Sequence, residues 1–235
     1  IRAEQAVPHI NHPNFLWSID TATLFRVKND RLLEIFNGHP TVHNNGGGDW
    51  PGMEDAWDAI LTRGKKIYGI AVDDAHHFQG EFAKGRANPG RGWVVVRARS
   101  RDAREIVTAL DEGHFYASTG PVVAEIAVTP TAVSLTITRT GDFKYTTQFV
   151  GANGKLLATD RSLTPSYRLR GTETYVRVRV VDSSGATAWL QPVFTTRHRT
   201  GTGSAPRPNQ AFAPAQAPAI HDFRAADSTA IGSGE

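Results

Sequence analysis

Apolar runs separated by polar turns divide the first half of the chain into segments that predict buried strands. Residues 67–72 form a continuous apolar run without alternation, as expected of a strand covered on both faces, and residues 32–36 predict a second buried strand. Strands are also predicted at residues 6–11 and 93–98. Glu34 interrupts the run at 32–36, and we expect it to have a partner, because an isolated buried carboxylate is costly.

Helical spacing of apolar residues appears twice between these runs. It covers residues 54–63, where Gly64 marks the end. It recurs after Asp102 and Glu105, which have the spacing of a capping box, and Gly113 ends this second helix. Strands alternating with helices predict parallel β-α units, as in a β/α barrel, where functional groups gather at the carboxyl ends of the strands.

From about residue 122 the pattern changes to short alternating segments. Tyr175, Arg177 and Arg179 alternate with valines, so we expect them on the opposite face of one strand. The pairs Asn153-Gly154 and Ser184-Gly185 are typical of hairpin turns. We therefore predict a small antiparallel β-sandwich over residues 121–196. It could be a stabilising appendage or, more specifically, a module that binds carbohydrate or a partner.

The pattern thus divides the chain into three parts. Residues 1–120 form the α/β part and residues 121–196 the β-sandwich. Residues 197–235 are dominated by Pro, Ala, Gly and Ser, a composition that cannot bury enough apolar surface to order itself.

Composition narrows the chemistry more than the fold. The 235 residues carry a formal charge of only +3, with basic residues scattered, so no nucleic-acid partner is predicted. Cysteine is absent, so any metal must use His, Asp or Glu, and a periplasmic or secreted location is permitted without being required. No apolar run has the length of a membrane span, so no membrane partner is predicted.

The candidate chemistry gathers where the predicted strands end. The run Asp73-Asp74-Ala75-His76-His77 follows the strand at 67–72 and is either a divalent-metal site or a solvated polar turn. His12 and Asn37 follow neighbouring strands. Because carboxyl ends of parallel strands meet at one edge, we expect these groups to converge, which favours metal binding over the turn.

Local geometry gives further expectations. Pro13 predicts an extended backbone at His12. Regular alternation would place His9 on the face opposite His12, as a hydrogen-bonded wall residue. The glycine-rich segment 44–52 lacks the lysine of a P-loop, so we do not expect it to bind phosphate in that way. We interpret it as a lid or a plain connector.

Four runs, in this order, resemble the C-terminal half of the PHP-domain (polymerase and histidinol phosphatase) metallohydrolases. They are Asn11-His12-Pro13-Asn14, Glu34-Ile35-Phe36-Asn37-Gly38, Asp74-Ala75-His76 and Gly113-His114-Phe115-Tyr116-Ala117-Ser118-Thr119-Gly120-Pro121. The match looks closest to the branch that includes carbaryl hydrolases and covers about residues 7–121. It implies part of a distorted β/α barrel with divalent ions, commonly zinc, manganese or iron.

The resemblance also implies roles for individual residues. By this resemblance, His12, Asp74 and His76 would be the metal ligands and catalytic residues. Groups that would orient ligands or contact substrate are His9, Glu34, Asn37, Asp73 and His77.

The family's His-x-His motif and its other early ligands have no match in this chain. The chain opens at Ile1 and its only methionine is Met53, so we expect an N-terminal segment or companion chain to complete the site. The predicted function is metal-dependent hydrolysis of a small phosphoester, carboxyl ester or carbamate. The alternative is a non-catalytic binding or structural module. A Ser-His-Asp hydrolase is a weaker option, because no Gly-x-Ser-x-Gly elbow occurs.

Overall fold

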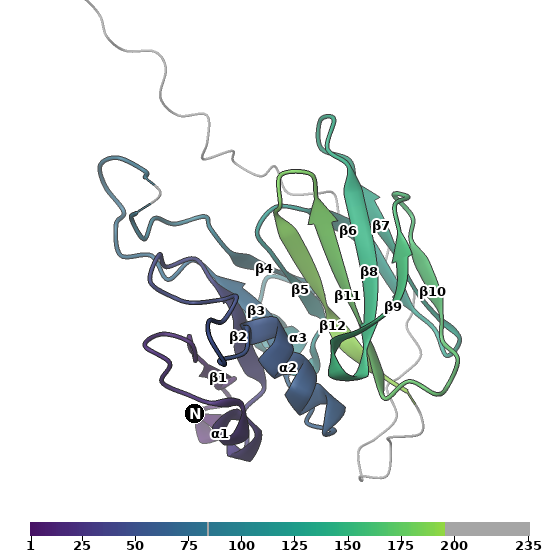
Figure 1. Ribbon diagram of the computed structural model, residues 1–235, viewed down its shortest axis with the longest axis horizontal. Helices are drawn as coiled ribbons and strands as arrows, with labels where there is room; N and C mark the ends of the chain where they lie inside the picture. The colour runs from purple at the N-terminus through teal and green to yellow at the C-terminus, as the bar shows by residue number, and fades with distance from the viewer. Residues whose placement is uncertain (84, 196–235) are drawn as a thin grey trace, which may run out of the picture.

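The computed structural model describes residues 1–83 and 85–195, and this part of the chain contains three open sheets and a few short helices (Figure 1). The predicted mixed class with a strand-rich second half is therefore confirmed. A β/α barrel is not seen among the described residues, since none of the three sheets closes on itself. The predicted segment 197–235, together with residue 196, lies outside the described residues.

The first sheet is parallel and contains three strands in the order β1-β2-β3, namely β1 (His9–Ile10), β2 (Leu32–Asn37) and β3 (Tyr68–Val72). Helix α1 (Thr21–Arg26) connects β1 to β2, and α2 (Met53–Thr62) connects β2 to β3. The prediction of parallel β-α units is confirmed for these strands. Their carboxyl ends consequently lie at one edge of the sheet.

The strand predicted at 93–98 does not continue this parallel sheet. It is β4 (Trp93–Val96), which pairs antiparallel with β5 (Phe115–Ser118), and β5 pairs antiparallel with β12 (Thr187–Phe194). The prediction was wrong because a strand's own residue pattern does not specify its partner or the direction of pairing. The resulting six-stranded sheet has the order β4-β5-β12-β11-β8-β9, completed by β8 (Tyr145–Gly151), β9 (Lys155–Asp160) and β11 (Tyr175–Asp182).

This six-stranded sheet includes strands from both sides of the predicted boundary at residue 120. A third sheet, β10-β7-β6, packs on it through one apolar cluster, which gives the antiparallel two-sheet arrangement expected for the second half. Its strands are β6 (Val122–Val128), β7 (Ala132–Thr138) and β10 (Ser166–Arg168). Asn153 and Gly185 have φ values of 57° and 90°, and they turn the chain between β8 and β9 and between β11 and β12.

Both faces of strand β11 are largely buried. Val176, Val178 and Val180 belong to the cluster between the two antiparallel sheets. Tyr175 and Arg177 face α2, where both contact the buried carboxylate of Asp58. The alternation predicted for this strand is confirmed. A second cluster, which includes Trp57 of α2 and Trp189 of β12, joins the parallel sheet to the six-stranded one.

Helix α3 (Ala103–Glu112) ends at Gly113 as predicted, with Gly113 in the left-handed region at φ 77°. The predicted capping box is not formed, because the Asp102 carboxylate accepts a hydrogen bond from the Ser100 hydroxyl at 2.8 Å instead of capping the helix. Two 3-10 turns, Arg2–Glu4 and Ala152–Gly154, complete the elements.

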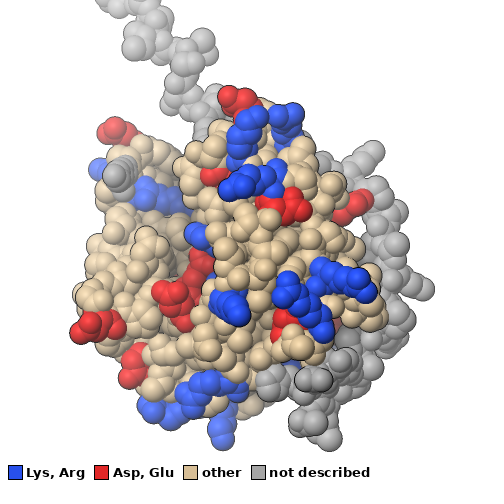
Figure 2. Space-filling view, turned by 45° about the vertical axis from the view of Figure 1, so that its right-hand side comes forward, with Lys and Arg blue, Asp and Glu red and all other residues tan. Residues whose placement is uncertain are grey.

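Charged side chains on the face drawn in Figure 2 form separate small groups, with acidic and basic residues interspersed. The formal charge of +3 is therefore not concentrated in one patch on this face. Within the described residues, no helix combines the length and apolar character needed to cross a membrane.

Candidate functional site

The carboxyl ends of β2 and β3 are joined by one side-chain amide. Asn37, the last residue of β2, is buried, and its Nδ2 atom donates to Glu34 Oε2 at 3.0 Å and to Asp74 Oδ2 at 3.1 Å. Asp74 lies just beyond β3. The prediction that groups after neighbouring strands converge is therefore confirmed for Asn37 and Asp74.

Glu34 has the compensation that its buried position requires. Its side chain is 4% exposed, and Oε2 also accepts a hydrogen bond from the backbone N–H of His12 at 2.6 Å. His9 Nε2 lies 3.5 Å from Oε1. Two donors and a nearby imidazole thus surround this carboxylate, which offsets the cost of removing it from water.

His12 reaches this cluster with its backbone rather than its ring. Its φ is 23°, so the extended conformation predicted from Pro13 is wrong. The chain turns here, with the N–H of Phe15 donating to the carbonyl of His12 at 2.9 Å, and the imidazole packs edge-on against the Phe15 ring. The expected opposite faces for His9 and His12 also do not apply, because β1 ends at Ile10 and both residues contact Glu34.

Asp74 and His76 form the closest pair of metal-competent side chains in the predicted run. Asp74 Oδ1 lies 3.4 Å from His76 Nε2, and the two side chains are 29% and 62% exposed. Asp74 has a φ of 48°, a conformation that a non-glycine residue adopts only when its surroundings impose it. The backbone N–H groups of His76 and His77 both donate to the carbonyl of Ala87, which fixes the run after β3.

The remaining predicted residues of the run lie outside this pair. Asp73 Oδ2 accepts a hydrogen bond from the backbone N–H of Gly90 at 2.8 Å, so it holds the returning loop. His77 is exposed. Among the described residues, no group of three or more His, Cys, Asp or Glu side chains is placed to hold a metal ion. The structure therefore brings Asp74 and His76 together without adding the His12 ring to them.

Sequence reasoning missed two residues that build this edge. The Asn44 amide pairs reciprocally with the backbone of Asn37, accepting from its N–H and donating to its carbonyl, each at 2.8 Å. The N–H of His39 donates to Asn37 Oδ1 at 2.8 Å, and the His39 ring lies edge-on to that of His76 at 5.4 Å between centroids. The position of His39 directly after the Asn37-Gly38 turn was the available signal.

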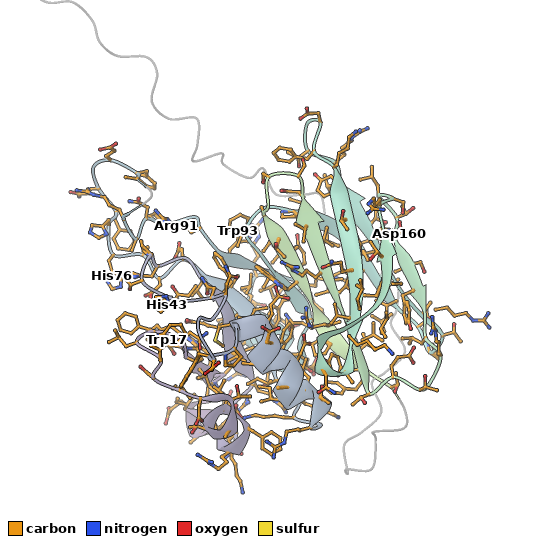
Figure 3. All side chains as sticks on the ribbon, in the orientation of Figure 1. Trp17, His43, His76, Arg91, Trp93 and Asp160 are labelled. Carbon is orange, nitrogen blue, oxygen red and sulfur yellow. The ribbon has the colours of Figure 1, made fainter. Side chains whose placement is uncertain are left out.

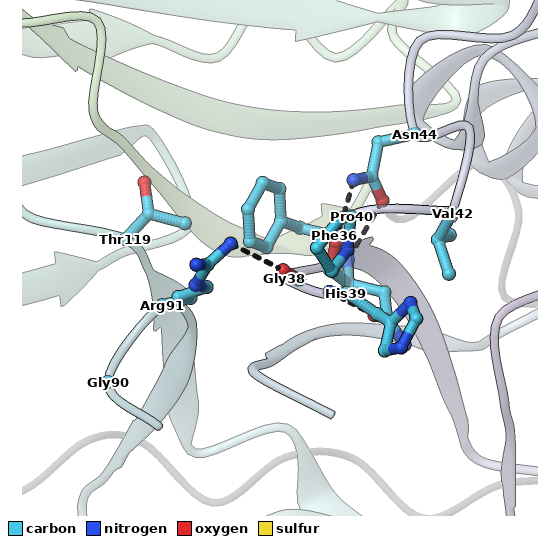
Figure 4. Close-up of a pocket in the computed structure, with 10 residues that line it drawn as sticks. Phe36, Gly38, His39, Pro40, Val42, Asn44, Gly90, Arg91 and Thr119 are labelled. Atoms are coloured by element: carbon cyan, nitrogen blue, oxygen red, sulfur yellow. Dashed lines mark hydrogen bonds between the residues drawn. The ribbon is translucent and has the colours of Figure 1, made fainter. Parts of the chain in front are cut away.

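An open pocket of about 510 Å³ is lined by Asn37 and His39, which contact Asp74 and His76. It is lined by residues of the segment 36–44 and by Gly90, Arg91 and Thr119 (Figure 4). Arg91 lies in its wall and donates to the carbonyl oxygens of Gly38 at 3.3 Å and Ala83 at 2.6 Å. This volume is in the range of small-molecule sites.

Aromatic contacts anchor the glycine-rich segment 44–52. Trp17 stacks on His43 at 4.4 Å and lies 5.9 Å from Trp50, between ring centroids (Figure 3). The indole N–H of Trp50 donates to Asn14 Oδ1 at 2.9 Å. In this conformation the segment is packed against the turn after β1, which supports the connector interpretation over the lid.

No protein-family model matches the chain, and no curated protein sequence matches it.

Proposed function

We propose that this chain supplies part of the active site of a metal-dependent hydrolase that cleaves a small phosphoester, carboxyl ester or carbamate with water. The observation that carries the proposal is the Asp74–His76 pair, which is connected to buried Glu34 through Asn37, a residue that also lines a pocket of ligand size. Part of a PHP-type β/α barrel, as the sequence motifs suggest, would place such a pair at the carboxyl ends of its strands.

The two donor atoms suit one divalent ion. Asp74 Oδ1 and His76 Nε2 are 3.4 Å apart, which matches two donors that each lie about 2.1 Å from a tetrahedral zinc ion. Manganese and iron accept the same carboxylate and imidazole ligands. Catalytic zinc sites have three protein ligands, one more than this pair supplies. We therefore propose that an N-terminal segment or companion chain provides the further ligands.

The remaining residues orient this pair. Asn37 donates to Asp74 Oδ2, which leaves Oδ1 toward His76. Asn37 also donates to Glu34, which accepts a further hydrogen bond from the backbone N–H of His12. His9 contacts the same Glu34 carboxylate. When bound, a divalent ion supplies Lewis acidity, which lowers the pKa of water and polarises an ester or phosphoryl oxygen. The side chains of Asp74 and His76 are 29% and 62% exposed, so both are accessible from solvent.

The test measures metal and hydrolysis together in the complete protein. The protein is loaded with zinc, manganese or iron, dialysed, and assayed for metal content and for cleavage of p-nitrophenyl phosphate and p-nitrophenyl acetate. Asp74→Asn and His76→Gln should lose metal and activity together. His114→Gln is the matched control, because His114 and Glu112 form an exposed histidine–carboxylate pair with a similar 3.3 Å separation.

Metal content and hydrolysis that are unchanged in His76→Gln would contradict the proposal. The competing class is a non-catalytic binding or structural module, and the presence of only two ligand side chains in the pair favours it. A complete protein that retains no metal and cleaves neither substrate would support that class instead.

A further inference from the structure

We infer that the pocket lined by His39 and Arg91 binds a compact oxyanion, a carboxylate or a phosphate, attached to a short apolar body. This inference rests on the proposed function in one respect, namely that the pocket receives the substrate or product of the hydrolase. It goes further by assigning the part of that molecule which the pocket recognises. Four observations carry it.

His39 offers a hydrogen-bond donor to the pocket. Its Nδ1 atom accepts from the backbone N–H of Thr41 at 3.3 Å and lies 2.9 Å from the Thr41 hydroxyl. Because Nδ1 is the acceptor, the neutral ring carries its proton on Nε2. Within the described residues, no group accepts a hydrogen bond from Nε2, so this donor is available to a ligand.

Arg91 contributes positive charge to the pocket wall. Figure 4 shows Arg91 and Thr119 on one side of the pocket and His39 on the other. The carbonyl oxygens of Gly38 and Ala83 accept hydrogen bonds from the guanidinium and hold it in this place. A ligand oxyanion between the two sides would therefore meet a fixed cation and an imidazole N–H.

None of the lining residues is acidic. The three carboxylates of the cluster around Asn37 and Asp73 are not part of the lining. Asp73 accepts from the N–H of Gly90, Asp74 from Asn37, and Glu34 from His12 and Asn37. The lining thus contains one cationic side chain and no carboxylate, which favours an anion over a cationic ligand.

Apolar side chains complete the lining. Phe36, Pro40 and Val42 contribute hydrocarbon surface next to these polar groups. A pocket of about 510 Å³ accommodates a small molecule with one charged head and a few carbon atoms. A fully hydrophilic ligand such as free phosphate would leave this surface unused.

The experiment uses three probes that share a four-carbon chain: butyrate, butyl phosphate and the neutral butyramide. Binding to the complete protein is followed by NMR titration in the presence of a chelator, without metal or turnover. We expect butyrate or butyl phosphate to saturate the pocket and butyramide to bind about ten-fold more weakly or worse, since a charge-assisted hydrogen bond is lost. The comparison of the two anions decides between carboxylate and phosphate as the natural head group.

Two sets of variants test the residues. His39→Phe keeps a ring beside His76 but removes the donor, and should weaken anion binding about ten-fold, while His39→Gln should restore part of it. Arg91→Gln should weaken binding and Arg91→Lys should retain more of it, because lysine keeps the charge. His114→Phe, at the far end of β5 from Thr119, is the matched control and should bind as the parent does.

Equal affinity for butyrate, butyl phosphate and butyramide, or no saturable binding of either anion, would overturn the inference. So would unchanged anion binding in His39→Phe with the fold intact by circular dichroism. These results do not depend on metal or catalysis. A failure of the oxyanion site is therefore distinguishable from a failure of the hydrolase proposal, which is measured by metal content and hydrolysis.

Discussion

The side-chain amide of Asn37 spans the gap between β2 and the segment after β3 and donates to Asp74 Oδ2 at 3.1 Å. The same nitrogen donates to Glu34, and the amide oxygen of Asn37 accepts from the backbone N–H of His39, so these contacts use both amide hydrogens and the oxygen. One buried residue therefore sets the positions of the proposed metal ligand, of the buried carboxylate behind it, and of the pocket histidine.

Replacing Asn37 by leucine keeps the approximate volume and removes all three hydrogen bonds. We expect zinc affinity to fall by about 10–100-fold, as is usual when a group that orients a ligand is lost. Zinc affinity is measured by competition with a chromophoric chelator. Asn45→Leu is the control, because Asn45 is an exposed asparagine of the neighbouring loop. Equal zinc affinity in Asn37→Leu and the parent would contradict this role.

The buried ion pair between Asp58 and Arg177 should dominate the attachment of α2 to β11. Two hydrogen bonds of 2.6 and 2.7 Å join the carboxylate to the guanidinium, and each side chain is no more than 4% exposed. Asp58→Asn removes the buried carboxylate that accepts two hydrogen bonds from the guanidinium and leaves Glu54, whose Oε2 lies 3.0 Å from Arg177 Nη1, so the free energy of unfolding should fall by about 1.5–3 kcal/mol.

Chemical denaturation measures that loss, with Asp55→Asn as the control. Asp55 lies on the same helix but is exposed, and its replacement should change the free energy of unfolding by less than about 0.5 kcal/mol. Similar losses in the two variants would show that the pair contributes little.

Tyr175 should remain protonated well above the ordinary tyrosine pKa of about 10. Burial raises the pKa of its hydroxyl, and the charge of Asp58 and the hydrogen bond to it raise the pKa further. Because the folded pKa is raised, this stabilisation is complete below about pH 10 and is lost as the pH rises through the folded value.

While the protein stays folded, raising the pH should give the same phenolate absorbance change in the parent and in Tyr175→Phe. The parent should show the larger change only after it unfolds. An additional tyrosine that titrates near pH 10 in the folded parent, and is missing from Tyr175→Phe, would contradict the prediction.

Gly69 of β3 lies where a side chain has no room. An added Cβ would come within 2.7 Å of Ile35 Cδ1 and 3.0 Å of the Trp57 ring, both in the core. Gly69→Ala should destabilise the fold by about 1–3 kcal/mol through overpacking. Gly85→Ala, where a Cβ would meet nothing within 4 Å, is the control in thermal unfolding. A melting temperature unchanged by Gly69→Ala would show that the neighbouring core side chains shift to accommodate the added methyl group.

The sequence by itself determined the elements and the location of the candidate site. Apolar runs identified β2 and β3, helical spacing identified α2 and α3, and alternation identified β11. These signals are local, because burial imposes its period on the residues of a single element. The polar residues after β2 and β3 followed from the same reasoning, since parallel strands bring their carboxyl ends together.

Only the tertiary structure decided which atoms meet. Whether β4 would pair with the parallel sheet or antiparallel with β5 depends on partners distant in sequence, and so does the burial of Arg177 against Asp58. The contact of His12 through its backbone instead of its ring arises from a turn with positive φ, which Pro13 did not predict. Strand period specifies a face, whereas packing between segments specifies which residues share a hydrogen bond.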